Sequence, residues 1–224
     1  MEWILKAIDF VLHVDVYLEQ IISNYGGWTY ALLFLVIFME TGFVVTPFLP
    51  GDSLIFAAAT FAARGSLNPW LMFALLGFAA VIGDSVNYWI GHRIGTRAYT
   101  GEIKWIKKEY MERTHVFFEK HGGKTIFLAR FVPIIRTFTP FVAGVTRMSY
   151  GFFFRWNVIG GLVWVATFTL LGYFFGNIPF VQNNFELVIV AIILISLVPA
   201  VVEGIKAKKE MSAKPVEKKD VSGE

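Results

Sequence analysis

The stretch R-F-V-P-I-I-R-T-F-T-P-F-V-A-G, residues 130–144, decides the fold class. It is apolar enough to lie in a bilayer, yet it carries two arginines and two prolines. An arginine at the centre of a membrane costs about 3 kcal/mol even on the lenient insertion scale. A chain accepts that cost where the charge faces a cavity, a partner or a ligand. The stretch therefore predicts an interrupted membrane segment rather than a continuous spanning helix.

The composition of the whole chain supports a membrane protein. Of its 224 residues, 56% are hydrophobic and 17% are charged, which is typical of integral membrane proteins. There is no cysteine, which excludes disulfides, thiol chemistry and cysteine-based metal sites. The N-terminus lacks a basic region and a small-residue cleavage site, so no removable signal peptide is expected. We expect one membrane domain over 1–204 and a tail at 205–224.

Charges, prolines and glycines divide the membrane domain. Residues 1–24 alternate polar and apolar faces at helical spacing and carry too many charges for a span, which predicts an amphipathic helix at the membrane interface. Residues 28–63 are apolar but contain T-P-F-L-P-G-D, which favours a helical hairpin that enters and returns. The other expected segments are a span at 67–91, a polar loop at 92–124, a second re-entrant hairpin at 125–148, spans at 152–175 and 185–204, and a disordered basic tail.

The distribution of lysine and arginine predicts the orientation. The 92–124 loop and the tail are rich in these residues and are expected to be cytoplasmic, with the C-terminus inside. Residues 1–28 hold one lysine and four acids, which favours the outside. Both assignments agree if each interrupted segment returns to the side from which it came.

Two short motifs recur along the chain. T-P-F-L-P-G at 46–51 resembles T-P-F-V-A-G at 139–144, and Y-W-I-G at 88–91 resembles Y-F-F-G at 173–176. With the opposite orientations, this echo predicts an inverted repeat, in which broken segments meet at a central site. The predicted fold class is therefore an all-α polytopic membrane protein: an inverted repeat with two re-entrant helical hairpins, transmembrane helices and an N-terminal amphipathic helix.

Several spaced motifs together resemble the DedA family, also called the VTT or SNARE-associated membrane proteins. They cover about residues 25–204 and are E-T-G at 40–42, P-G-D at 50–52, G-D-S-V-N-Y-W-I-G-H-R-I-G at 83–95, F-L-A-R-F-V-P-I-I-R-T at 127–137, G-G-L-V-W at 160–164 and G-Y-F-F-G at 172–176. The resemblance implies a bacterial inner-membrane protein with two re-entrant hairpins. It also implies lipid transport: bacterial members are associated with returning undecaprenyl phosphate across the membrane, others handle phospholipids, and dependence on the proton-motive force is a family theme.

Arg130 and Arg136 are the candidate ligands of a lipid phosphate. Guanidinium is permanently charged and presents a planar fork that suits phosphate oxygens. The two arginines would lie about 240° apart on a continuous helix, but a break at Pro133 would let them converge. The alternative is that both reach the membrane interface or neutralise intramembrane acids.

Glu40 and Asp52 are the candidate proton-coupling residues. Burial disfavours the charged form of a carboxylate and a nearby arginine favours it, so substrate arrival can change the protonation of such a group. The alternatives are a structural salt bridge for Glu40 and a helix N-cap for Asp52. Asp84, Asn87 and Tyr88 share one helix face and either line the same cavity or form a buried hydrogen-bonded cluster.

The leading hypothesis is a flippase for an anionic lipid, most directly undecaprenyl phosphate, with protons, the lipid and the membrane as partners. A phospholipid flippase or scramblase and a proton-coupled ion antiporter are the alternatives, although two arginines would repel a cation. No histidine lies in the apolar segments and none has metal-ligand spacing, so we expect neither an enzyme nor a metal or cofactor. No nucleic-acid partner is expected, and homo-oligomerisation is left open.

Overall fold

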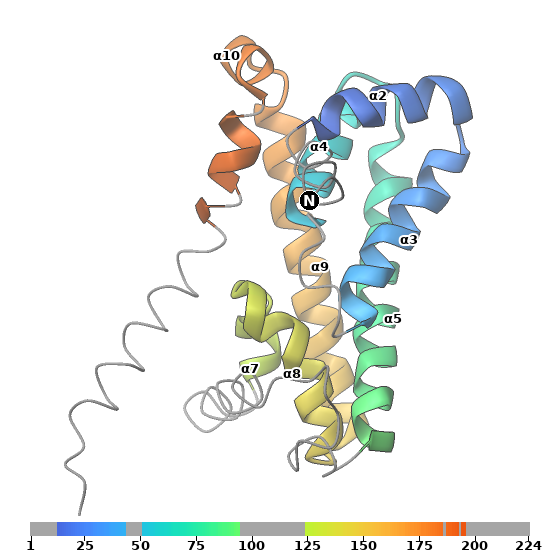
Figure 1. The fold of residues 1–224 in the computed structure, drawn as a ribbon, viewed down its shortest axis with the longest axis vertical. Coiled ribbons are helices and arrows are strands. Elements are labelled where there is room, and N and C mark those ends of the chain that lie inside the picture. Colours follow the sequence, from blue (N-terminus) through green and yellow to red (C-terminus); the bar gives the residue numbers. More distant parts are fainter. Residues whose placement is uncertain (1–12, 44–50, 95–123, 186, 193, 196–224) are drawn as a thin grey trace, which may run out of the picture.

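The computed structural model describes residues 13–43, 51–94, 124–185, 187–192 and 194–195. All regular secondary structure within these residues is helical, which confirms the all-α fold class. The helices, drawn in Figure 1, are α2 (Val14–Tyr25), α3 (Trp28–Gly42), α4 (Gly51–Ala63), α5 (Pro69–Ile94), α7 (Thr125–Ala129), α8 (Pro133–Val145), α9 (Tyr150–Phe175) and α10 (Pro179–Asn183), and the described residues of 185–195 are also helical.

Two long helices, α5 and α9, run the length of the molecule side by side (Figure 1). Each has 26 residues and is long and apolar enough to cross a membrane, since about 20 residues suffice. Large apolar side chains along both helices are exposed, including Phe78, Ile159, Leu162 and Leu170. An exposed apolar surface of this kind suits lipid rather than water. These helices correspond to the expected spans at 67–91 and 152–175.

The chain from α3 to α4 reverses direction halfway along the long helices. At the end of the bundle that holds Pro69, the Asn68 backbone N–H donates to the Tyr30 hydroxyl at 2.6 Å. Helix α3 then runs beside α5 until its last residue, Gly42, packs on Gly83. Helix α4 begins next to Glu40 and returns to the same end, where Thr60 donates to the Gly172 carbonyl at 3.3 Å. The end of α3 and the start of α4 therefore both lie at mid-length of the bundle.

The chain from α7 to α8 reverses in the opposite sense. Ile126 on α7 packs with Tyr88 and Phe153 near the end of the bundle that holds Ile94, and Gly144 on α8 packs on Tyr88 at that same end. Between the two helices, the backbone N–H of each of residues 130–132 donates to the carbonyl three residues earlier, and Val132 is extended. A residue that precedes proline is disfavoured in helical conformation, so Pro133 explains the break.

We call α3 with α4 the first reversal and α7 with α8 the second reversal. The two approach from opposite ends of the bundle and meet near its middle (Figure 1). Helices α4 and α8 each have 13 residues, and α5 and α9 each have 26. The T-P-F-x-x-G echo, however, does not mark equivalent places. Its first copy ends at Gly51, where α4 begins, whereas its second copy lies inside α8. This motif therefore does not support the repeat, and the inverted repeat and the re-entrant path through a bilayer stay predictions.

Other expected segments are described in part. The predicted N-terminal helix at 1–24 is seen from α2 onward, where Leu18 is buried against the core. It ends at Gly26, whose positive φ of 49° suits glycine. The loop at 92–124 lies almost entirely outside the described residues, as do the last part of the 185–204 span and the tail at 205–224.

A close approach between α5 and α8 yields a stability prediction. A Cβ at Gly91 would collide with the Phe141 carbonyl, which is backbone and cannot turn aside. We expect Gly91→Ala to lower the free energy of unfolding by about 1–3 kcal/mol, as overpacking does. The matched control is Gly151→Ala, because a Cβ at Gly151 meets nothing within 4 Å. Thermal unfolding in detergent measures both, and equal midpoints for the two variants would contradict the packing described here.

Candidate functional site

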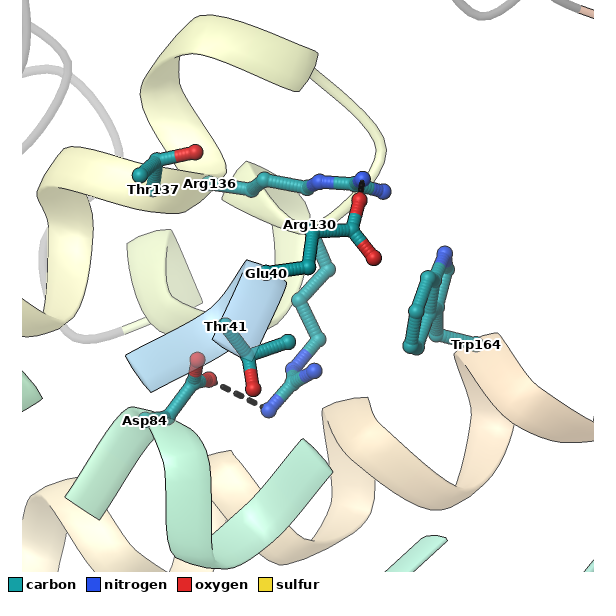
Figure 2. A pocket seen from close by; sticks show the side chains of 7 residues that line it. All are labelled: Glu40, Thr41, Asp84, Arg130, Arg136, Thr137 and Trp164. Carbon is teal, nitrogen blue, oxygen red and sulfur yellow. Dashed lines mark hydrogen bonds and ion pairs between the residues drawn. The ribbon is translucent and has the colours of Figure 1, made fainter. Parts of the chain in front are cut away.

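A small cavity lies where the two chain reversals meet between the long helices. Its volume is about 10 Å³, and Figure 2 shows the side chains that line it: Glu40, Thr41, Asp84, Arg130, Arg136, Thr137 and Trp164. These come from α3, α5, α8, α9 and the break before α8. A volume of this size accommodates about one water molecule. The charged groups are therefore in direct contact with one another rather than separated by a water-filled space.

Arg136, in the first turns of α8, is held by two acids from the other reversal. Its Nη2 pairs with Glu40 Oε1, and its Nη1 donates to Asp52 Oδ1 at 2.8 Å. Trp164 on α9 completes the group: its Nε1–H donates to the same Asp52 oxygen at 2.9 Å, and the guanidinium lies 5.1 Å from its ring. A cation over an indole face is attracted by the ring quadrupole. Arg136 thus joins α8 to α3, α4 and α9.

Arg130 has a different set of partners. Its Nη2 pairs with Asp84 on α5 and donates to Asn157 Oδ1 on α9 at 2.5 Å. All three side chains are buried. Figure 2 shows Arg130 turned toward Asp84 and Arg136 reaching toward Glu40. The two guanidiniums therefore line one cavity but form two separate charged groups.

Both arginines pair with intramembrane acids, which was the alternative to a role as phosphate ligands, but each arginine has its own acids. Arg136 contacts both Glu40 and Asp52, as the sequence suggested. Arg130 instead pairs with Asp84, which the sequence did not single out as a partner of either arginine. The break at Pro133 explains the difference. Arg130 precedes the break and Arg136 lies in α8 after it, so the two side chains leave the backbone in different directions.

Of the three polar residues expected to share one face of α5, only Asp84 lines the cavity. Asn87 is buried and donates to the Thr41 carbonyl at 3.2 Å and the Thr137 carbonyl at 2.9 Å, so it ties both reversals to α5. Tyr88 belongs to a separate aromatic cluster with Phe153 and donates to the Met148 carbonyl. The possible cavity-lining role considered for Asn87 and Tyr88 is thus replaced by a packing role.

Two site residues are absent from the sequence-based candidates. Asn157 is an amide in an otherwise apolar span, and the adjacent pair Gly160–Gly161 was an available signal that a side chain from elsewhere crosses α9 there. Trp164 is one of seven tryptophans, most of which are expected at the membrane interface. Its position in the middle of a span was the one feature that distinguished Trp164 from an interfacial tryptophan.

The site is electrostatically costly, since Glu40, Asp84 and Arg130 are buried, and Asp52 and Arg136 are largely shielded from water. Breaking such a buried pair by removing one partner typically costs about 3–5 kcal/mol, because an uncompensated charge remains. The first group holds one arginine and two carboxylates, and the second holds one of each. Gly51 is part of this close packing, because a Cβ there would collide with Glu40 Oε2.

Comparisons with known proteins place the chain in a family. The family model described as the VTT domain matches residues 49–174. Over 212 residues, 93% of this chain and 97% of the relative, the sequence is 53% identical to Protein DedA of Escherichia coli. The chain belongs to the DedA family. Its resemblance to that family is therefore confirmed.

Other DedA-family relatives are similar over shorter lengths. An uncharacterized membrane protein of Mycobacterium leprae is 43% identical over 169 residues, 75% of this chain and 76% of the relative. Inner membrane protein YqjA of Escherichia coli is 34% identical over 154 residues, 68% of this chain and 70% of the relative. No solved structure matches. These relatives support a membrane-embedded protein, and all the cavity residues except Glu40 and Thr41 lie within the matched VTT domain.

Proposed function

We propose that this DedA-family protein is a lipid transporter that moves an anionic lipid monophosphate, most directly undecaprenyl phosphate, across the bacterial inner membrane. The observation that carries the proposal is Arg136: a permanently charged guanidinium lies largely shielded at mid-length of a membrane protein, with its side chain 13% exposed, and is held there by carboxylates. Carboxylate and phosphate oxygens bind the same planar fork. The acids therefore occupy the place that a phosphate headgroup takes when lipid binds.

Binding requires the site to open. A cavity of about 10 Å³ holds about one water, and a phosphate headgroup is larger. Because the acids come from α3 and α4 and Arg136 comes from α8, movement of one reversal away from the other exposes the guanidinium. The headgroup then enters between the reversals, with Arg130 contributing a second positive charge. The polyprenyl tail stays in lipid against the exposed apolar side chains of the long helices.

Charge balance suggests how protons take part. Arg136 with ionised Glu40 and Asp52 carries one excess negative charge, which disfavours an incoming phosphate. Protonation of one acid removes that excess. Binding of the lipid and uptake of a proton are therefore linked, so a proton gradient drives or resets the site. Asp52 Oδ1 is held by both Arg136 and Trp164, so we assign the exchangeable proton to Glu40.

The proposed topology follows the lysine and arginine distribution. The end of the bundle near Ile94 and Tyr150 faces the cytoplasm, as does the C-terminus, and the end near Pro69 faces outside. Each reversal then enters and leaves on one side of the membrane as a re-entrant hairpin. Two observations support an inverted repeat. Helix α4 matches α8 in length, and α5 matches α9. In addition, α4 packs on α9 as α8 packs on α5.

Two other transport functions use the same residues. A phospholipid flippase or scramblase also needs a cationic site for phosphate, and it differs from the leading proposal in its tail and headgroup. A proton-coupled ion antiporter would use the acids as its ion site, but Arg130 and Arg136 line the same cavity and oppose a cation pathway. We propose no enzymatic activity.

Proteoliposomes distinguish these functions. We expect the purified protein to accelerate the loss of headgroup accessibility of a labelled polyprenyl monophosphate, with no effect on cation flux. Phosphatidylglycerol and phosphatidylethanolamine, presented in the same vesicles, test the phospholipid alternative. Movement of all three lipids at equal rates would favour a scramblase. Cation exchange without lipid movement, or release of inorganic phosphate from a polyprenyl pyrophosphate, would contradict the proposal.

A further inference from the structure

The two arginines differ in which elements hold them, and this difference suggests different roles. The acids of Arg136 come from α3 and α4, the first reversal. The partners of Arg130 come from the long helices, with Asp84 on α5 and Asn157 on α9. When the reversals separate, Arg136 must change partners. Arg130 lies on the second reversal and keeps its partners on the long helices when the first reversal, α3 with α4, is the one that moves.

Asn157 is fixed in the orientation that Arg130 needs. Its Nδ2 donates to the Val81 carbonyl at 3.0 Å and lies 3.4 Å from Ser85 Oγ on α5. A backbone carbonyl only accepts, so the amide nitrogen must face Val81 and the oxygen must face the arginine. Asn157 thereby also connects the two long helices directly.

Helix α9 is shaped to receive the Arg130 side chain. A Cβ at Gly160 would lie 3.0 Å from Arg130 Cδ and 3.1 Å from its Nε, and one at Gly161 would lie 3.3 Å from its Nη2. The aliphatic stem and Nε therefore lie against Gly160, the end of the guanidinium lies against Gly161, and Nη2 pairs with Asp84 and Asn157. We call Asp84, Asn157, Gly160 and Gly161 the Arg130 seat.

Charge also separates the two arginines. Arg130 is balanced by one carboxylate and a neutral amide, so its group has no excess charge. Arg136 faces two carboxylates, so its group carries one excess negative charge. Only in this group can binding of an anion be balanced by uptake of a proton. The first group needs no change in protonation to remain stable during transport.

We propose that Asn157 is a positioning residue that, with Asp84, fixes Arg130 to the long helices, so that Arg136 alone exchanges its acids for the headgroup phosphate. This inference rests on the proposed function and divides its site between a fixed and an exchanging cation. If Arg130 is released from its seat, it becomes a second mobile cation beside Glu40 and Asp52. The acids then gain an alternative partner, and turnover slows although the phosphate ligand is intact.

The test separates binding from transport, using the full chain in detergent and in proteoliposomes. Binding is measured with farnesyl phosphate, a short polyprenyl monophosphate, and with farnesol, which has the same tail without phosphate. We expect Asn157→Leu to keep the dissociation constant for farnesyl phosphate within about threefold while its maximal flipping rate falls about tenfold or more, whereas Arg136→Gln weakens binding about tenfold or more. A general loss of structure would not give this split.

Gly161→Ala provides a milder second variant should Asn157→Leu not be recovered folded. Its Cβ would lie 3.2 Å from Val81 Cγ2 and 3.3 Å from Arg130 Nη2, and we expect the same split between binding and rate; Gly151→Ala is its matched control. Weakened binding of farnesyl phosphate in the seat variants, equal to that of Arg136→Gln, would overturn the division of roles and leave the proposed function intact. Unchanged flipping in these variants would overturn it as well. Equal binding of farnesyl phosphate and farnesol by the unaltered protein would instead overturn the proposed function.

Discussion

Arg136→Ala is expected to lower the rate of lipid flipping about 100-fold or more, because charge-assisted hydrogen bonds contribute about 1.5–3 kcal/mol each and a bound phosphate makes at least two to this fork. The same change leaves Glu40 and Asp52 without their cation. That loss uncouples them from the substrate. Flipping of a labelled polyprenyl monophosphate in proteoliposomes measures the effect.

The matched control for this prediction is Arg155→Ala. Arg155 lies on α9, is exposed and is outside the cavity, so the change removes the same charge without touching the site. Arg136→Lys is expected to retain partial activity, because an ammonium supplies the charge without the planar fork. Arg130→Ala is also expected to reduce flipping strongly, because it leaves Asp84 buried without its cation. Unchanged flipping after either Arg136→Ala or Arg130→Ala would contradict the proposed site.

Glu40→Gln is expected to remove the dependence of flipping on a proton gradient. Glutamine has nearly the shape of glutamic acid but cannot change its charge, so the Arg136 group loses its exchangeable proton. We expect the rate with an imposed pH gradient to fall about tenfold, to the rate without one. Parallel assays with and without the gradient make this measurement.

The outcome also separates the two interpretations of Glu40. If Glu40 only forms a structural salt bridge, Glu40→Gln lowers both rates by the same factor and the dependence on the gradient persists. Glu19→Gln is the matched control, because Glu19 lies on α2, is exposed and is remote from the Arg136 group. A gradient effect that survives in Glu40→Gln would contradict the coupling proposed for this acid.

Much of the fold could be predicted because membrane segments leave strong one-dimensional signals. The apolar runs of α5 and α9 and the breaks near Pro133 and Gly51 were readable from composition and from proline and glycine alone. The repeat motif was misleading because short aromatic matches arise easily in a chain with 23 phenylalanines. Its two copies fall before one helix and inside another, so helix lengths are a sounder basis for comparing the halves.

The site was predictable in its charges but not in its pairing. Intramembrane arginines and acids stand out because each is costly, which is why Glu40, Asp52, Asp84, Arg130 and Arg136 were all identified. Which acid meets which arginine depends on how α8 is rotated after the break, and no sequence pattern specifies that rotation. Asn157 was missed because the only sequence signal near it, the Gly160–Gly161 pair, indicates a close contact on α9 but does not name Arg130 as the side chain that makes it.

The most direct test of the central claim is to identify the lipid that copurifies with the protein. Mass spectrometry of the protein isolated in mild detergent is expected to find a polyprenyl monophosphate enriched over its abundance in the membrane. The same lipid should be depleted in Arg136→Ala and retained in Arg155→Ala. Enrichment that is equal in Arg136→Ala and the unaltered protein, or no enrichment of any anionic lipid monophosphate, would contradict a phosphate site at Arg136.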